Sequence, residues 1–123
     1  MLKVYKCSVC GNFVLLADDK GGPLACCGKP MKELVANTVD AAKEKHVPVV
    51  KQEGNVVEVF VGEVEHPMTE AHYIGLIVLE TNKNLLMKHL NYTDKPYAKF
   101  NLLDDEEVIA AYEYCNLHGF WKK

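Results

Sequence analysis

The sequence contains no arginine, so fourteen scattered lysines supply all of its basic side chains other than histidine. Surfaces that bind nucleic acid usually present a basic stripe that includes arginine, and this pattern therefore predicts no nucleic-acid partner. No run approaches the roughly 18–20 apolar residues that a membrane span needs. The amino end, MLKVYKCSVC, also lacks the apolar segment and cleavage site of a secretory signal. We therefore expect a cytoplasmic protein with no membrane partner.

The length of 123 residues allows one ordinary domain or a core domain with a small appendage. The charge is divided unevenly along the chain. Residues 1–36 carry five lysines and three acidic residues, whereas residues 37–123 carry nine lysines and fourteen acidic residues. Four of the five cysteines also lie within the first 27 residues. We predict a small domain of residues 1–36 and a larger domain of residues 37–123.

The small domain contains four cysteines in a pattern typical of a metal site. Cys7 and Cys10 form a C-x2-C pair followed by glycine, and the adjacent Cys26 and Cys27 are followed by glycine too. Adjacent cysteines rarely form a disulfide with each other, because the bond needs a specific twist and spacing. The expected compartment also keeps thiols reduced. Four thiolates suit one zinc or one iron ion, and a purely structural zinc site stays open. Because this segment has few apolar residues, the metal would supply much of its folding free energy.

From residue 37 onward, short apolar segments alternate with turn residues, as is typical of a β-sandwich. Residues 56–61 alternate between apolar and polar positions, and residues 72–79 are apolar on both faces. Residues 84–92 and 97–102 indicate two further strands. Residues 104–115 are ambiguous, because the acidic start and the alanines could open a helix while the aromatic residues fit a strand. We predict a strand there.

Four histidines and the fifth cysteine form a second candidate metal site. His46 lies at the start of the larger domain, and His66 and His72 bracket a turn-like segment. His118 follows Cys115 in a C-x2-H pattern that places a thiolate and an imidazole close enough to share one ion. Four imidazoles and one thiolate are too many donors for closed tetrahedral zinc. They suit a transition metal such as iron or copper with five ligands and an open sixth position.

Two other interpretations fit part of this pattern. A blue-copper protein beside a structural zinc site would also be a β-sandwich with a late cysteine–histidine pair, but the final GFWKK lacks the methionine that it normally needs. A non-catalytic electron carrier would need a closed coordination sphere, against which an open sixth position argues. The remaining histidine, His89, lies in a predicted strand without a partner motif, and we interpret it as a surface or packing residue.

Five motifs taken in order resemble desulfoferrodoxin, the two-iron class of superoxide reductase. They are KCSVCGN, LACCGKPM, EKHVPV, HPM and CNLHGFW, and they span nearly the whole chain. The resemblance implies a mainly β fold in which a rubredoxin- or desulforedoxin-like metal knuckle precedes an immunoglobulin-like β-sandwich. It implies two irons per chain, one in an Fe(Cys)4 centre, where zinc is also possible, and one in a catalytic Fe(His)4(Cys) centre. The implied ligands of the first iron are Cys7, Cys10, Cys26 and Cys27. Those of the catalytic iron are His46, His66, His72 and His118 in a plane, with Cys115 as the axial thiolate.

The same resemblance implies one-electron reduction of superoxide to hydrogen peroxide by a homodimer, with rubredoxin or a similar carrier as electron donor. Lys45 and Glu44, which precede His46, are the implied catalytic residues. The ammonium group of Lys45 would attract the anion and order a proton-donating water. Glu44 would occupy the sixth position of the iron after peroxide has left. The chain departs from the family's usual pattern at Tyr73, where tryptophan is frequent, but this residue is not an implied ligand.

Overall fold

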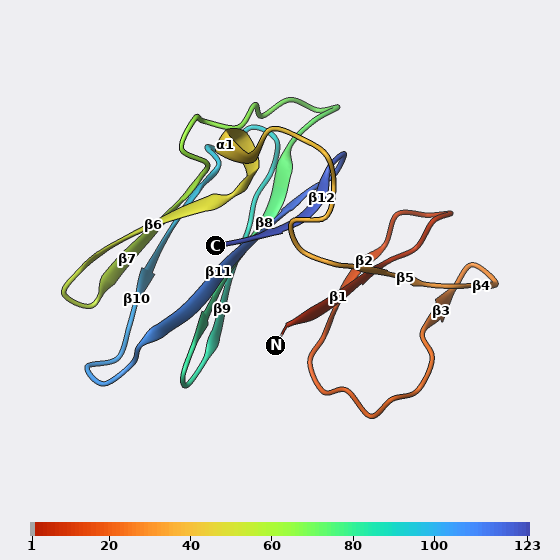
Figure 1. Cartoon of the computed structure of the whole chain (residues 1–123), viewed down its shortest axis with the longest axis horizontal. Helices are drawn as coiled ribbons and strands as arrows, with labels where there is room; N and C mark the ends of the chain where they lie inside the picture. Colours follow the sequence, from red (N-terminus) through yellow and green to blue (C-terminus); the bar gives the residue numbers. More distant parts are fainter. Residues whose placement is uncertain (1) are drawn as a thin grey trace. The chain divides into compact units, whose positions relative to one another are not determined.

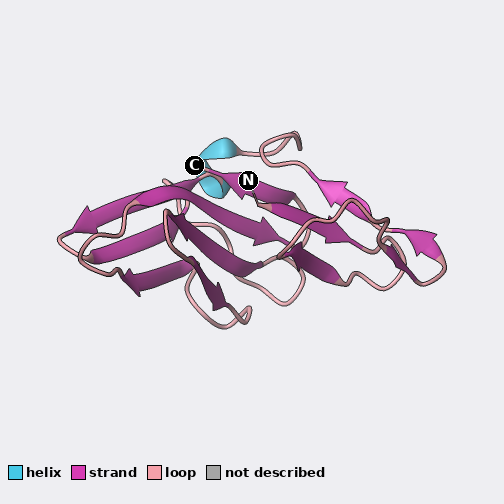
Figure 2. Ribbon diagram, turned by 90° about the horizontal axis from the view of Figure 1, so that it is seen from below, coloured by secondary structure: helices cyan, strands magenta, loops and turns pink. Residues whose placement is uncertain are grey.

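The structure is a computed structural model that describes residues 2–123. The chain divides into two compact units, Met1–Val35 and Ala36–Lys123. Figure 2 shows that nearly all of the regular structure is strand, and the single helix of the described residues is four residues long. This confirms the mainly β fold that the sequence predicts. Within residues 2–123, no helix combines the length and the apolar character that crossing a membrane requires.

The first unit is built from short antiparallel strands (Figure 1). Its strands are β1 (Lys3–Lys6), β2 (Phe13–Leu16), β3 (Ala25–Cys26), β4 (Lys29–Pro30) and β5 (Lys32–Leu34). Three of them form a sheet in the order β2-β1-β5, and β3 pairs with β4 in a small hairpin. Val4 and Cys7 are the only buried side chains among residues 2–35. So small a core agrees with a segment whose stability depends on a bound metal.

The second unit is a sandwich of two antiparallel sheets (Figure 1). Its elements are α1 (Lys43–His46), β6 (Pro48–Glu53), β7 (Val56–Val61), β8 (Ile74–Thr81), β9 (Leu85–His89), β10 (Tyr97–Asn101), β11 (Val108–Cys115) and β12 (Gly119–Lys122). The sheets have the orders β10-β7-β6 and β12-β11-β8-β9, which is the three-plus-four layering of an immunoglobulin-like sandwich. The core lies between the sheets, where alternate residues of β7 (Val57, Val59 and Val61) meet Ile77 and Leu79 of β8.

The predicted strands are present, with shifted ends. The strand at residues 56–61 coincides with β7, whereas the one predicted at residues 72–79 begins two residues later, as β8. The ambiguous segment 104–115 forms strand only from Val108, because its acidic start makes a turn instead. Two strands of the second unit were not predicted, and no strand was predicted in the first unit. In β6 only Pro48 is buried and the last three residues are exposed, and β12 has just four residues, so neither has a long alternating pattern.

A β-bulge lies where the pairing of β8 with β11 reaches the end of the sandwich. Tyr114 pairs with Leu76 and Cys115 pairs with Ile74, so Gly75 is an extra residue on β8. An extra residue changes the direction of the side chains that follow it, because side chains alternate along a strand. Ile74 therefore joins the buried core together with Cys115. The bulge helps to set the position of this cysteine.

Candidate metal centres

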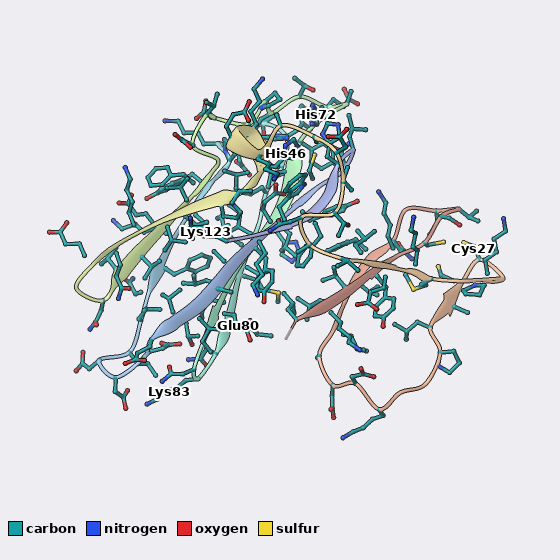
Figure 3. All side chains as sticks on the ribbon, in the orientation of Figure 1. Cys27, His46, His72, Glu80, Lys83 and Lys123 are labelled. Atoms are coloured by element: carbon teal, nitrogen blue, oxygen red, sulfur yellow. The ribbon has the colours of Figure 1, made fainter. Side chains whose placement is uncertain are left out.

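The second candidate site lies at one end of the sandwich and is built from four separate segments. His46 ends α1, His66 and His72 lie between β7 and β8, and Cys115 ends β11. His118 lies in the three-residue loop before β12, which Gly119 closes with a φ of 82°. That left-handed conformation favours glycine and is common in short hairpin loops. In Figure 3, His46 and His72 lie together beside α1.

The four imidazole rings form a closed square. Adjacent ring centroids are 4.8 Å apart for His46–His66, 4.5 Å for His66–His72, 5.0 Å for His72–His118 and 4.9 Å for His118–His46. Adjacent ring planes are nearly perpendicular, with angles from 78° to 83°. His46 and His72 face each other across the square, with centroids 6.4 Å apart and planes 29° apart. This is the arrangement that four equatorial ligands of one ion would need.

Cys115 lies on the axis of this square. Its side chain is fully buried, and its Sγ is 3.5 Å from His66 Nε2 and 4.0 Å from His118 Nδ1. These two rings stand at opposite corners, so a sulfur that approaches both lies over the centre. Because Cys115 belongs to the hydrophobic core, the sulfur is on the interior side.

Backbone carbonyls determine which nitrogen of two of the rings faces the centre. His46 Nδ1 is 2.7 Å from the carbonyl oxygen of Ala42, and His66 Nδ1 is 2.6 Å from that of Pro67. A carbonyl can only accept, so Nδ1 carries the hydrogen and Nε2 keeps a free lone pair. Metal-binding histidines are commonly oriented in this way.

The electrostatics keep these imidazoles neutral. Burial lowers the pKa of His66 to about 4, because the charged form loses its hydration. Burial is also the main reason why the pKa values of His46 and His72 lie below the ordinary value. The charges of His118 and Lys45 lower the pKa of His72 further. Neutral rings are the form that binds a metal.

The donor atoms fit a metal ion. One ligand atom from each of His46, His66, His72 and Cys115 lies within 4.8 Å of the others. His118 adds a fifth donor, because its Nδ1 is 3.0 Å from His46 Nε2. Two adjacent ligands that each lie about 2.1 Å from one ion would be about 3 Å apart. His72 Nε2 is buried and has no hydrogen-bond partner among residues 2–123, which a metal would provide. Five such donors suit a transition metal with more than four ligands.

Lys45 and Glu44 both lie on α1 and are exposed. The helix is anchored to the loop after β7, where the N–H of Val64 donates to the carbonyl of Glu44 over 2.7 Å. Gly62 makes this close approach possible. A Cβ atom at Gly62 would lie 2.8 Å from the carbonyl oxygen of Glu44 and 2.9 Å from that of Val47, which is too close for any side chain. Gly62 therefore fixes where the segment that carries Lys45 and His46 lies.

Two buried residues were missed by the sequence analysis, and one of them contacts the site. The Trp121 ring stacks on His46 with a centroid distance of 4.9 Å, and its indole N–H donates to the carbonyl of His118 over 3.1 Å. Glu113 is fully buried on β11, and its carboxylate oxygens have no hydrogen-bond partner among residues 2–123. Burial raises the pKa of Glu113 well above its usual range. A lone tryptophan after CNLHGF was visible in the sequence, but a glutamate in an apolar strand gave no sign of burial.

The four cysteines of the first unit also come together, and each offers a sulfur within 4.8 Å of the others. Cys10 Sγ lies 3.7 Å from Cys26 Sγ, and the sulfurs of Cys26 and Cys27 are 3.9 Å apart. Backbone N–H groups of Val9 and Cys10 donate to Cys7 Sγ over 3.4 Å each. The backbone bends at Cys27, whose φ is 54°, and this bend lets adjacent cysteines face one point.

The charge states of these thiols differ strongly. Hydrogen bonds from the backbone of Cys10 and Val9 lower the pKa of Cys7 to about 6. Contact with Cys10, Cys26 and Cys7 raises the pKa of Cys27 to about 12. The thiol of Cys7 thus ionises easily, whereas that of Cys27 resists ionisation, because negative charge accumulates in a small volume. A bound cation would relieve this repulsion, so the cluster fits a tetrahedral thiolate-bound metal.

The fold and the two sites define a two-centre metalloprotein, with a four-cysteine group in one unit and, in the other, a group of three histidines and one cysteine that His118 joins through its contact with His46. This confirms the predicted pair of cofactor sites. The family model for desulfoferrodoxin matches residues 38–123, and the model for the desulfoferrodoxin N-terminal domain matches residues 1–34. The chain belongs to the desulfoferrodoxin family, as its motifs indicated.

Individual relatives agree with this assignment. A desulfoferrodoxin from Syntrophotalea carbinolica is 50% identical over 120 residues, which cover 98% of this chain and 94% of the relative. A desulfoferrodoxin homolog from Archaeoglobus fulgidus is 46% identical over 122 residues, 99% of this chain and 96% of the relative. The crystal structure of the superoxide reductase from Treponema pallidum is similar over 100% of this chain and 98% of that chain, with a TM-score of 0.84 and 39% identity. The match with the superoxide reductase (1Fe-SOR) from Giardia intestinalis covers 66% of this chain and 96% of the Giardia chain, with a TM-score of 0.56 and 39% identity.

Proposed function

We propose that the protein is a superoxide reductase, which reduces superoxide to hydrogen peroxide at an iron with five protein ligands. These ligands are His46, His66, His72, His118 and Cys115. The observation that supports this most is the square of four imidazoles with a buried sulfur on its axis, because this donor set leaves a sixth position free. The name of the Treponema pallidum protein, which is similar over the whole chain, supports the same activity.

The reaction consumes one superoxide, one electron and two protons, and it forms one hydrogen peroxide. His46, His66, His72, His118 and Cys115 would hold a ferrous ion, which would supply the electron. The protein must attract a small anion, keep the ligand set neutral apart from the thiolate, and deliver protons. The lowered pKa values of His46, His66 and His72 meet the second need, because these rings stay uncharged at pH 7.

Lys45 is the residue to which we assign attraction of the substrate. Its ammonium group is exposed, and its charge is the smallest of three causes that lower the pKa of His72, after burial and the charge of His118. A positive charge on the helix that carries His46 would raise the local concentration of a small anion. The same group can orient a water that donates the protons.

Glu44 is the residue that we assign to the sixth position once peroxide has left. Its charge already acts on His46, where it opposes the lowering of the pKa by burial. Its side chain lines a cavity together with Val47, Glu63 and Lys123. The proposed role therefore requires the carboxylate to turn from this cavity towards the imidazole square.

For the first unit we propose an iron held by Cys7, Cys10, Cys26 and Cys27, which relays electrons from a rubredoxin-like carrier. Zinc in the same place would make the unit structural. Three further expectations extend the proposal: a small external electron donor, a homodimer and a cytoplasmic location. Sedimentation of the purified protein tests the dimer, and reduction of the oxidised protein by reduced rubredoxin tests the donor.

The decisive experiment is metal analysis of anaerobically purified protein, followed by mixing of the reduced protein with superoxide. We expect two irons per chain, one peroxide per superoxide and no oxygen. One iron with one zinc would keep the activity and make the first unit structural. Oxygen release would indicate dismutation, and no reaction would indicate an electron carrier. Copper, or no metal at the histidine site, would refute the proposal.

A further inference from the structure

The side chain of Asn116 joins the end of the Cys115 strand to the loop that carries His72. Asn116 Oδ1 accepts a hydrogen bond from the N–H of Tyr73 over 2.8 Å, and Asn116 Nδ2 donates to the carbonyl of Ala71 over 3.0 Å. The backbone N–H of Asn116 also donates to the carbonyl of Tyr73 over 3.2 Å. One side chain thus holds the peptide groups on both sides of His72.

His72 needs such support more than two of the other histidines. The rings of His46 and His66 are each fixed by a carbonyl at Nδ1. Within residues 2–123 the structure describes no hydrogen bond from the His72 ring, and its Nε2 points into the square without a partner. The direction of this ring therefore depends on its backbone. Thr69 holds one part of that backbone, since Thr69 and His72 exchange N–H to carbonyl bonds of 2.9 and 3.2 Å.

We propose that Asn116 is a positioning residue for His72, which fixes this ligand relative to Cys115 so that both reach the same metal ion. The inference rests on the ligand set proposed above. Asparagine suits the role because it offers a donor and an acceptor in one planar group. Aspartate would keep the acceptor for Tyr73 but would place an oxygen against the carbonyl of Ala71. Alanine would remove both bonds.

The fold contains a matched control at the other end of the same pair of strands. Asn82 follows β8 and contacts Glu107, just before β11, through two hydrogen bonds. Its Oδ1 accepts from the N–H of Glu107 over 2.9 Å, and its N–H donates to the carbonyl of Glu107 over 3.0 Å. Both asparagines join the same two strands, Asn116 with two side-chain hydrogen bonds and Asn82 with one, but only Asn116 adjoins two proposed ligands. If the asparagines only stabilise the fold, replacing either one has the same effect on the metal site. If Asn116 positions a ligand, only its replacement changes metal binding.

The experiment compares Asn116→Ala, Asn82→Ala and His72→Ala in the full-length protein loaded with iron. Two quantities are measured: the rate at which excess chelator removes iron from the histidine site, and the absorption spectrum of the ferric form. The four-cysteine centre of the same chain is an internal reference.

Because loss of an outer partner typically weakens metal binding about 10–100-fold, we expect Asn116→Ala to release this iron faster by a factor in that range, with an altered spectrum. Asn82→Ala should match the wild type in iron-release rate and in ferric spectrum, even if its melting temperature falls as much as that of Asn116→Ala. Asn116→Asp gives the same comparison if the alanine variant does not fold.

Two results would overturn the inference and are distinguishable. If His72→Ala loses iron but Asn116→Ala behaves like Asn82→Ala, Asn116 is only structural and the proposed function stands. If His72→Ala retains iron as the wild type does, His72 is not a ligand, and both the ligand set and the role of Asn116 are wrong.

Discussion

The Nε2 atom of His46 lies 3.0 Å from the Nδ1 atom of His118, although 72 residues separate the two histidines in the sequence. Trp121 contributes to this approach, because it stacks on the ring of His46 and donates to the backbone carbonyl of His118. The two nitrogens are within direct hydrogen-bond distance, and 3.0 Å is also the spacing of two adjacent ligands of one metal ion.

Replacing His118 with alanine is expected to lower the iron content from two per chain to about one. It removes one of five proposed ligands and leaves a solvent-accessible gap, so the remaining four hold the ion weakly. Metal analysis of the purified variant measures this. His89→Ala is the control, because His89 lies exposed on β9 and should leave the iron content unchanged. A His118→Ala protein that retains both irons would contradict the ligand set.

Lys45→Ala is expected to slow the reaction of the reduced protein with superoxide by roughly tenfold at low ionic strength, because a charge that attracts the anion is lost. The difference should shrink as salt is added, since salt screens the attraction. Rapid mixing at several salt concentrations measures both effects. Lys43→Ala is the control, because it removes an exposed lysine from the same short helix. Equal rates for the two variants would show that Lys45 has no special role.

Gly62→Ala is expected to lower stability by about 1–3 kcal/mol, as overpacking typically does, and to weaken metal binding. The new Cβ would lie within 3.0 Å of three backbone atoms of Glu44, Lys45 and Val47, which cannot move independently. The segment that carries His46 must therefore shift. Denaturant unfolding and iron content measure the two effects. Gly22→Ala is the control, because a Cβ there meets nothing within 4 Å. A stable Gly62→Ala protein with full iron content would refute this explanation.

Glu106→Gln is expected to reduce the loss of stability in acid. Hydrogen bonds from the hydroxyl of Thr81, the N–H of Leu103 and the amide of Asn84 lower the pKa of Glu106 below 4.5. A carboxylate whose folded pKa is lowered stabilises the protein above the unfolded pKa, and this contribution disappears as pH falls through the folded pKa. The variant lacks that titration, so its curve of unfolding midpoint against pH should be flatter below pH 4.5.

Urea unfolding of wild type and variant between pH 3 and pH 7, roughly the range in which carboxylates titrate, measures this difference. Glu107→Gln replaces the exposed neighbouring carboxylate and is the matched control. If both variants show the same dependence on pH, the hydrogen-bonded network around Glu106 does not contribute to the acid sensitivity.

Several features could be predicted from the sequence because their cause is local. The alternation of Val57, Val59 and Val61 around polar residues predicts a strand half-buried in a sandwich, and β7 has these bounds. The C-x2-C spacing of Cys7 and Cys10 and the adjacent pair Cys26 and Cys27 indicate a thiolate site, because all four residues are close along the chain. The four histidines needed more than spacing. Their sequence settings grouped them with Cys115 as a candidate site, but their ligand roles came from the resemblance to a family, because no local rule joins His46 to His118.

The sequence by itself determined which chemical groups the protein has: five thiols, five imidazoles and a lysine beside one of them, together with the apolar alternation that makes two sheets. The tertiary structure decided the rest. It selected which nitrogen of His46 and His66 faces inward, it buried Glu113 in an otherwise apolar strand, and it required Gly62 where α1 approaches the loop after β7. The physical reason is that ring orientation, burial and close backbone approach are set by neighbours far away in the sequence. Only the packing of the sheets brings those neighbours together, so a local sequence pattern does not specify them.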